Sequence, residues 1–439
     1  MTALSSGTSN ASLAPQDGSL WRRDMTVVPD ARRPCPTIGL AALMRLAYAG
    51  ESLQPVWDQL AARVAADPAD AAAMMDMSVV LQLSGERQRG LDMQAAALEL
   101  ERVYCRPHGR ADGLRVAAFV VAGDFMANTP LDFLLEGSDI DLRLVYLDAE
   151  GNPPSEVPEH DVAFMAVSES PTAAAALQGI AKALPAWAAP VMNGHPGRVA
   201  ALTRDGIAAL FAEDAHVLAP PVIQLSRQSL AVLGNGGVEA ATIFDGSGFP
   251  FVVRPVGSHA GQGLCKLDDP AAVSSYLAEQ ADAEFYLSPF VDYRSADGLY
   301  RKQRIVFIGK RPFIAHMAVS EHWMVHYLSA GMTTGAEKRA EETAFMRGFD
   351  TGFAVRHEAA FRSLCDKIGL DYFGIDCAET RDGRLLLFEA DVAMIVHALD
   401  PEPDFSYKKP VMRGLFAAFQ QELEAKVRPV NEDLRWAAR

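Results

Sequence analysis

The sequence predicts an α/β protein that carries an additional helical region near its N-terminus. Three patterns support this fold class. Apolar strands alternate with helices over residues 112–220, two β-hairpins follow in the C-terminal half, and Ala, Leu and Met recur at helical spacing over residues 38–103. Strands that alternate with helices form parallel sheets covered by helices. We therefore expect a doubly wound α/β domain between the helical region and a larger domain that contains the hairpins.

Composition limits the classes of protein to which the chain can belong. It has 439 residues, of which 49% are hydrophobic. It can therefore bury the cores of roughly three domains, and global disorder is excluded. The formal charge of -16 disfavours binding to nucleic acid or anionic membranes, because both depend on clustered Lys and Arg. The five cysteines are scattered without metal-ligand spacing, which indicates reduced thiols in a cytoplasm.

The N-terminal quarter is expected to contain a tail and a helical module. Residues 1–33 are rich in Ser, Ala, Pro, Gly and Asp without an apolar signal-peptide core, so they predict a flexible tail. In the helical module, residues 34–108, the small residues Ser78, Gly90 and Ala97 fit a tetratricopeptide pattern. The module resembles one and a half degenerate repeats. Because repeats need neighbours to bury their faces, it is expected to pack on the main body or on a partner chain.

Residues 112–220 contain the elements of a small parallel sheet. Strands are expected at Leu114–Ala122, Asp141–Tyr146 and Asp161–Val167, and a helix at Ala173–Leu184. In such sheets, ligands bind beyond the carboxyl ends of the strands. The residues after these strand ends are therefore expected to help hold an acceptor substrate.

A glycine-rich hairpin opens the C-terminal half. Its first strand ends at Arg254, and the loop that follows contains Gly257, Gly261 and Gly263. Glycines allow the backbone to approach a ligand closely and to direct N–H groups at an anion. Arg254 would hold a phosphate by charge and by its planar fork, with Ser258 as a hydroxyl donor.

A second hairpin carries three carboxylates. The Asp382-Gly383 pair predicts a tight turn, which returns the chain so that Asp376 lies near Glu389 and Asp391. Converging carboxylates repel one another unless a cation separates them, and oxygen ligands of this kind suit Mg²⁺ or Mn²⁺. The alternative is an ordinary hairpin whose acidic residues face solvent.

Together the two hairpins resemble the ATP-grasp superfamily, which includes D-alanine–D-alanine ligase and glutathione synthetase. The resemblance covers roughly residues 221–400, with a looser match back to about residue 112. Arg254 stands where the family has a lysine, and Asp376 and Glu389 keep the family's metal-ligand spacing. Asp391 replaces the family's asparagine. The resemblance implies ATP as a substrate, Mg²⁺ or Mn²⁺ as a cofactor, and these three carboxylates as the metal ligands.

The resemblance extends to the segment between the hairpins. The backbone of Tyr286 and Leu287 falls where the family holds adenine, and Asp292 would replace the usual ribose-binding glutamate. Arg304 lies on the strand whose arginine faces the transferred phosphoryl group, with the cations at 301 and 302 as alternatives. Such a cation would stabilise charge that develops on an acylphosphate.

Three further segments are expected to be helical. Residues 331–352 are polar and charged, which predicts a solvated helix or a mobile lid. Residues 359–368 predict a helix that leads into the second hairpin, and residues 411–427 an exposed amphipathic helix. His326 and His397 fall near the expected metal side, where they would be either ligands or structural residues.

These observations predict an ATP-dependent carboxylate–amine ligase with its ATP-grasp domain at residues 221–439. Two alternatives remain: a kinase that phosphorylates a small molecule, and a non-catalytic nucleotide-binding scaffold in which the helical module carries the function. The expected partners are small-molecule or peptide carboxylates and amines. A homodimer or a peptide contact through the helical module is a further expectation.

Overall fold

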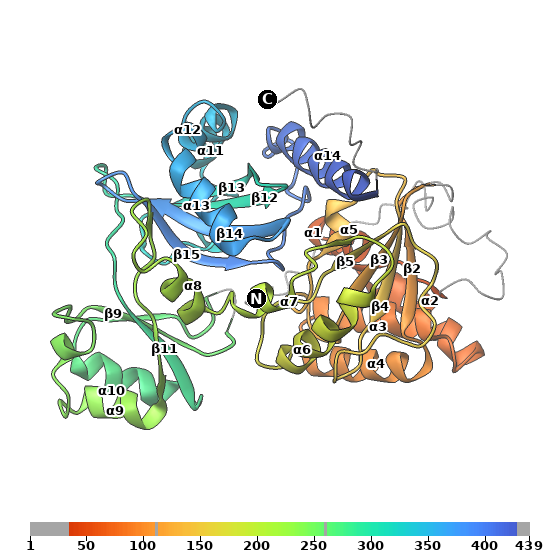
Figure 1. Cartoon of the computed structure of the whole chain (residues 1–439), viewed down its shortest axis with the longest axis horizontal. Coiled ribbons are helices and arrows are strands. Elements are labelled where there is room, and N and C mark those ends of the chain that lie inside the picture. The colour runs from red at the N-terminus through yellow and green to blue at the C-terminus, as the bar shows by residue number, and fades with distance from the viewer. Residues whose placement is uncertain (1–34, 110–112, 259–260, 428–439) are drawn as a thin grey trace.

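The computed structural model describes residues 35–109, 113–258 and 261–427. The predicted flexible tail, residues 1–33, lies outside this part of the chain. Figure 1 shows an N-terminal half built on one sheet with helices, and a C-terminal half that contains two further sheets. This arrangement confirms the predicted α/β fold class with additional N-terminal helices.

Four helices form the predicted helical region. They are α1 (Leu40–Tyr48), α2 (Gln54–Ala66), α3 (Ala71–Leu83) and α4 (Arg87–Leu100). The carboxylate of Asp70 caps α3 by accepting the Ala73 backbone N–H at 2.9 Å, because the first turn of a helix leaves its N–H groups without partners. Ala71 and Met75 of α3 pack against Tyr104 in a shared core. The helices therefore pack on the main body as expected, and the tetratricopeptide resemblance stays a prediction.

The first sheet has six strands in the order β1-β2-β4-β3-β5-β6. The strands are β1 (Cys35–Pro36), β2 (Val103–Pro107), β3 (Arg115–Val120), β4 (Asp141–Tyr146), β5 (Val162–Met165) and β6 (Val191–Met192). The three predicted strands are present and pair in parallel, whereas β2 runs antiparallel to β4. β1 and β2, which precede the expected boundary at residue 108, belong to this sheet.

Four short helices accompany this sheet and lead into the C-terminal half. They are α5 (Leu131–Leu134), α6 (Ala174–Ala183), α7 (Pro196–Ala200) and α8 (Arg204–Leu210). The α6 helix confirms the one predicted from Ala173. Thr203 caps α8 by accepting the Gly206 N–H at 3.0 Å, which fixes the start of this helix at Arg204.

The second sheet contains the glycine-rich hairpin and has the strand order β10-β9-β11-β8. Its strands are β8 (Ile223–Ser226), β9 (Phe251–Pro255), β10 (Cys265–Leu267) and β11 (Glu284–Pro289). Two helices, α9 (Arg227–Gly234) and α10 (Pro270–Glu279), share a compact core with it. The antiparallel pairing of β9 with β10 confirms the predicted hairpin.

The third sheet has the order β13-β12-β14-β15-β7. Its strands are β7 (Val217–Leu218), β12 (Tyr300–Ile308), β13 (Arg311–Ser320), β14 (Tyr372–Glu379) and β15 (Leu385–Asp391). The antiparallel pairing of β14 with β15 confirms the second hairpin. Gly383 in its turn has φ 79°, a backbone conformation that glycine adopts without steric cost.

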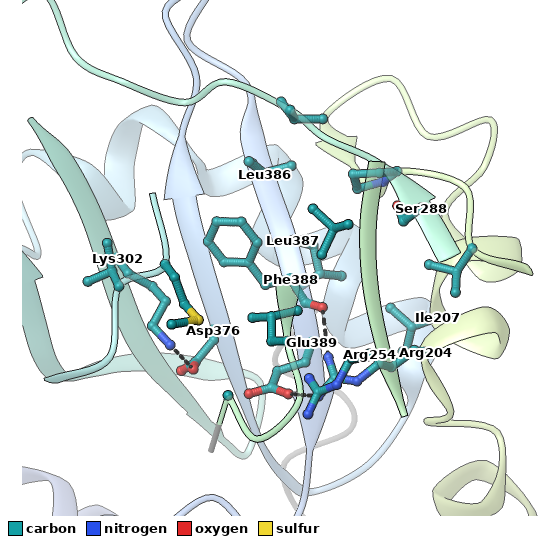
Figure 2. Close-up of a pocket in the computed structure, with 18 of the residues that line it drawn as sticks. Arg204, Ile207, Arg254, Ser288, Lys302, Asp376, Leu386, Leu387, Phe388 and Glu389 are labelled. Carbon is teal, nitrogen blue, oxygen red and sulfur yellow. Dashed lines mark hydrogen bonds and ion pairs between the residues drawn. The ribbon is translucent and has the colours of Figure 1, made fainter. Parts of the chain in front are cut away.

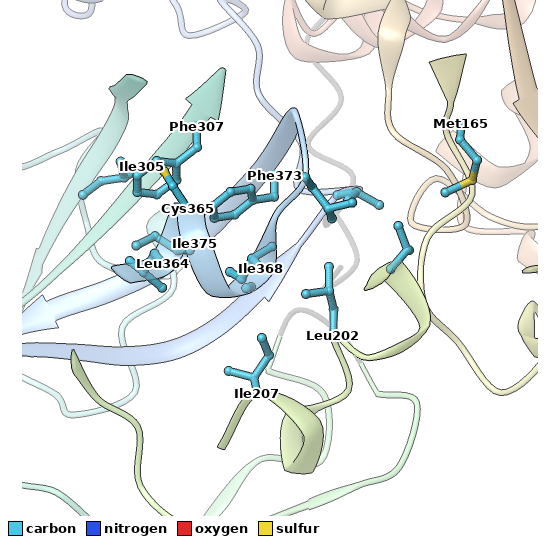
Figure 3. Close-up of a cluster of buried hydrophobic side chains, with 14 of the residues drawn as sticks. Met165, Leu202, Ile207, Ile305, Phe307, Leu364, Cys365, Ile368, Phe373 and Ile375 are labelled. Atoms are coloured by element: carbon cyan, nitrogen blue, oxygen red, sulfur yellow. The ribbon is translucent and has the colours of Figure 1, made fainter. Parts of the chain in front are cut away.

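Helices α11 (Ala336–Gly348), α12 (Phe353–Arg356) and α13 (Glu358–Ile368) follow β13. The α11 segment is therefore helical, one of the two predicted alternatives. Figure 3 shows α13 packed on one face of the third sheet, where Leu364 and Ile368 meet Ile305 and Phe373. Strand side chains alternate between faces, so the neighbours of these apolar residues are directed to the opposite face.

The C-terminal helix α14 (Lys408–Val427) differs from its prediction as an exposed helix. Phe416 and Phe419 are buried in a core that also contains Phe164 of the first sheet and Val306 of the third. The helix therefore joins the two halves of the molecule. Within the described residues, no helix is long and apolar enough to cross a bilayer.

Candidate active site

A cavity of about 350 Å³ lies between the second and third sheets. One wall comes from β9 and β11, and the opposite wall from β12, β14 and β15 (Figure 2). Its charged lining residues are Arg204, Arg254, Lys302, Arg304, Asp376, Glu389 and Asp391. Both predicted hairpins thus contribute to one cavity.

Strand register brings two cations onto one buried carboxylate. Arg304 lies directly opposite Asp376 in the pairing of β12 with β14, and Lys302 lies two residues away on the same face. The Asp376 Oδ1 accepts the Arg304 Nε–H at 2.8 Å, and its Oδ2 accepts Lys302 Nζ at 2.7 Å and Arg304 Nη2 at 3.1 Å. Arg304 also donates Nη1 to the Ile395 carbonyl at 3.2 Å. Both oxygens of Asp376 are therefore engaged with cations of the protein.

Burial and these ion pairs shift the pKa of Asp376 in opposite directions. Burial raises the pKa of a carboxyl, but Arg304 and Lys302 outweigh it and hold the pKa of Asp376 well below its usual range. The Asp376 side chain is 2% exposed. In the part of the chain that the structure describes, no group of three or more His, Cys, Asp or Glu side chains is arranged to hold a metal ion.

The other two carboxylates lie on β15 with different partners. Glu389 forms an ion pair with Arg204, which α8 places at the cavity, and its side chain is 30% exposed. Asp391 accepts the hydroxyl of Ser168 at 2.8 Å and the Ala393 N–H at 2.9 Å. The three acidic side chains therefore share one sheet face but are turned to separate partners. Their oxygen donors suit Mg²⁺ or Mn²⁺, and Glu389 is more exposed than Asp376.

Arg254 on β9 faces the cavity from the second sheet. Its Nε–H donates to the Ser258 hydroxyl at 3.0 Å, and a second N–H donates to the Ser258 carbonyl. Burial and the nearby Arg204 lower the pKa of Arg254 to about 9. A lowered pKa of a cation means that its positive charge is poorly compensated, so an anion bound between Arg204 and Arg254 would be stabilised.

An apolar compartment adjoins these charges. It is lined by Ala219, Pro220, Val222, Val252, Phe290, Val291, Leu386, Leu387 and Phe388. Tyr286 and Leu287 pair with β8 on one side and β9 on the other, so their backbone groups belong to the sheet ladder. Ser288 is the first β11 residue beyond the β8 pairing, and it lines the cavity. The accessible edge of this strand therefore begins at Ser288.

Some of the remaining predicted site residues line the cavity, and others do not. Gly261, Tyr286 and His326 line it. Asp292 pairs instead with Arg294, and half-buried His397 contacts Tyr48 at 5.1 Å between ring centroids. Ser258 is held by Arg254, and Gly257 and Gly263 flank a loop of which residues 259 and 260 lie outside the described residues.

One residue of the site, Arg204, was not predicted from the sequence, and Ser168 was predicted only as part of a segment that follows a strand end. Arg204 comes from α8, and Ser168 follows β5 in the first sheet. Residues after the strand ends of the first sheet were expected to help hold a substrate. Ser168 lies in one of these segments. No sequence signal marks Arg204, because it begins an ordinary capped helix whose approach to Glu389 depends on tertiary packing.

The charged residues of the site leave one net positive charge, which favours anions. Four cations, Arg204, Arg254, Lys302 and Arg304, face three carboxylates around the cavity. Burial, together with Lys302 and Arg304, lowers the pKa of His326, so its imidazole is neutral at neutral pH and adds no charge. Cations in a partly buried cavity attract anions more strongly than cations in open water. The cavity can therefore hold a phosphate chain beside a flat apolar group.

No family model matches the chain, and no curated protein matches it. Among solved structures, it is similar to the RimK domain protein ATP-grasp from Sphaerobacter thermophilus, with 13% identity, coverage of 71% of this chain and 99% of that chain, and a TM-score of 0.41. It is also similar to VanG D-Ala:D-Ser ligase from Enterococcus faecalis, with 13% identity, coverage of 72% and 100%, and a TM-score of 0.44. D-alanine–D-alanine ligase from Bacillus anthracis, complexed with ATP, gives 11% identity, coverage of 72% and 97%, and a TM-score of 0.44. Because each TM-score is below 0.5, the chemistry of this chain has to be inferred from its own cavity.

Proposed function

We propose that this chain is an ATP-dependent carboxylate–amine ligase of the ATP-grasp type. One observation carries the proposal: four cations and three carboxylates surround a single cavity that continues into an apolar compartment. ATP has the same two parts, a charged triphosphate and a flat, largely apolar base. A cavity of about 350 Å³ is within the size range of nucleotide and cofactor sites.

The charged residues of the cavity would bind the phosphates of ATP, and its apolar residues would bind the base. Arg204 and Arg254 would bind the phosphates, because both line the cavity, the charge of Arg254 is poorly compensated, and guanidinium forks bind phosphate oxygens in pairs. The apolar compartment would hold the base, with the backbone from Ser288 to Val291 at its edge. This assignment moves the expected base contacts a few residues beyond Tyr286 and Leu287.

Lys302 and Arg304 would act on the second substrate. A carboxylate oxygen of that substrate would attack the γ-phosphorus, and the bond from that phosphorus to the β-phosphate oxygen would break to release ADP. An amine would then attack the acyl carbon, expel phosphate and lose a proton to solvent. The two cations would orient the carboxylate and stabilise charge on the acylphosphate, so catalysis consists of positioning and charge neutralisation.

Glu389 and Asp391 are the carboxylates that would hold Mg²⁺ or Mn²⁺, because both line the cavity from one strand face and Glu389 is partly exposed. A divalent ion bound there would neutralise phosphate charge. The substrates would be small-molecule or peptide carboxylates and amines. The free thiols of the described cysteines, Cys105, Cys265, Cys365 and Cys377, favour a reducing compartment such as the cytoplasm.

The proposal can be tested with pools of amino acids supplied as carboxylate and amine. The purified chain is incubated with ATP, Mg²⁺ and carboxylates labelled with ¹⁸O, and products are analysed by mass spectrometry. The expected result is an amide, ADP, and phosphate that contains one ¹⁸O from the carboxylate. A phosphorylated substrate without free phosphate would identify a kinase instead. Nucleotide binding without turnover across all pools would favour the scaffold.

A further inference from the structure

The ion pairs of Asp376 set it apart from the other two carboxylates of the cavity. Its side chain is 2% exposed, against 30% for Glu389. Its two oxygens accept three hydrogen bonds of 2.7 to 3.1 Å from Lys302 and Arg304. Figure 2 shows Asp376 directed toward Lys302, whereas Glu389 is directed toward Arg204 and Arg254. A divalent ion on Asp376 would have to lie beside two cations that already share the same carboxylate.

The alternative use of Asp376 follows from the geometry of β12. Lys302 and Arg304 are long side chains two residues apart on one strand face, so they repel each other and would otherwise be free to rotate. Asp376 lies opposite Arg304 and bonds both of them. Without this carboxylate, Lys302 would lose its ion pair and Arg304 would keep only its hydrogen bond to the Ile395 carbonyl. The ordering of charged groups before substrate arrives is what gives such a site its catalytic effect.

We propose that Asp376 is a positioning residue that fixes Lys302 and Arg304, and that the site holds a single divalent ion on Glu389 and Asp391. This inference rests on the proposed nucleotide site and goes against the sequence prediction that Asp376 ligates the metal. Glu389 and Asp391 are two residues apart on β15 and share a face, which leaves them as the carboxylate pair for the ion.

The first test counts metal ions without measuring turnover. Mn²⁺ is titrated by electron paramagnetic resonance in the presence of a non-hydrolysable ATP analogue. The expected result is one Mn²⁺ per wild-type chain. Asp376→Asn should keep that ion with a Kd within fivefold of wild type, whereas Glu389→Gln should raise the Kd more than tenfold. Two Mn²⁺ ions per wild-type chain, or a Kd raised more than fivefold by Asp376→Asn, would overturn the proposal.

The second test reads the position of Lys302 directly. Lysines are acetylated with a limiting amount of acetic anhydride at pH 8, and each site is quantified by peptide mass spectrometry. Asp376→Asn should increase labelling of Lys302 at least fivefold, because its amine loses the carboxylate that holds it. Unchanged labelling of Lys302 would refute the positioning role. Asp366→Asn is the matched control, since Asp366 forms an exposed ion pair with Lys310.

Two reference lysines keep the labelling test interpretable. Lys408 is buried, so its labelling rises only if a variant unfolds, and exposed Lys310 reports the reactivity of a solvated amine. If the ATP analogue does not bind at all, the proposed nucleotide site fails. The labelling of Lys302 still decides whether Asp376 positions that lysine.

Discussion

A buried polar cluster centred on Glu342 tests how α11 and α14 are held to the third sheet. Glu342 of α11 is 0% exposed. Its carboxylate accepts the Met317 backbone N–H at 2.9 Å, the Tyr327 hydroxyl at 2.8 Å and the Tyr407 hydroxyl at 2.5 Å. Lys408 of α14 lies 3.5 Å away. One carboxylate thus ties α11 and α14 to β13, the edge strand beside Arg304.

Glu342→Gln retains the size of the side chain and removes its charge. Three charge-assisted hydrogen bonds lose their charge, and the amide offers one acceptor oxygen where the carboxylate offers two, which costs about 1–3 kcal/mol in all. Lys408 also loses one of its two carboxylates and keeps only Asp400, at 3.1 Å. Because removing one partner of a buried pair is strongly destabilising, we expect a total loss of about 2–4 kcal/mol in the free energy of unfolding.

Urea unfolding followed by circular dichroism measures this loss. The matched control is Glu358→Gln, because Glu358 is 71% exposed and pairs only across one helical turn with Arg362. That substitution should change the free energy of unfolding by less than about 0.5 kcal/mol. A Glu342→Gln protein as stable as the control would refute the role assigned to this cluster.

Three further changes test the site, the N-terminal helices and the C-terminal helix. Arg204→Met should raise the Kd for an ATP analogue more than tenfold by calorimetry, because it removes a guanidinium from the proposed phosphate site. Burial raises the pKa of Asp76 to about 6, so its contribution to stability falls as pH rises from about 4 through 6. Asp76→Asn cannot titrate, so its stability relative to wild type should improve by about 2 kcal/mol between pH 4.5 and 7 in urea unfolding. Phe419→Ala, at a fully buried position, should cost about 3–5 kcal/mol in the same assay.

Matched substitutions at exposed positions serve as controls for Arg204→Met and Phe419→Ala. Arg362→Met should leave nucleotide affinity within twofold, and Val427→Ala in α14 should cost less than about 1 kcal/mol. Equal effects of Arg204→Met and Arg362→Met would remove Arg204 from the site. A parallel pH profile for Asp76→Asn and wild type would show that Asp76 does not titrate in this range.

Local patterns predicted the hairpins, because alternation of apolar residues and an Asp-Gly turn determine strand pairing within a short stretch of chain. The second hairpin formed as expected, with Asp376 opposite Glu389. Local patterns could not predict which side chains contact one another across the sheet. Lys302 and Arg304 reach Asp376 only because β12 pairs with β14, more than seventy residues away.

Because local patterns do not reveal tertiary partners, the sequence also failed to predict the environment of some helices and strands. The apolar side of α14 was recognised, but its burial depends on a surface formed by the first and third sheets together. Likewise, β1 and β2 are short, and they form strands because neighbours in the first sheet supply their hydrogen bonds. Arg204 reaches the cavity because α8 packs against β15, and no local pattern predicts this packing.

A crystal structure with Mn²⁺ and a non-hydrolysable ATP analogue tests the central claim most directly. The account predicts the triphosphate between Arg204 and Arg254, the base beside residues 288–291, and one anomalous peak at Glu389 and Asp391. A nucleotide bound elsewhere on the molecule, or a cavity that stays empty at saturating analogue, would contradict it.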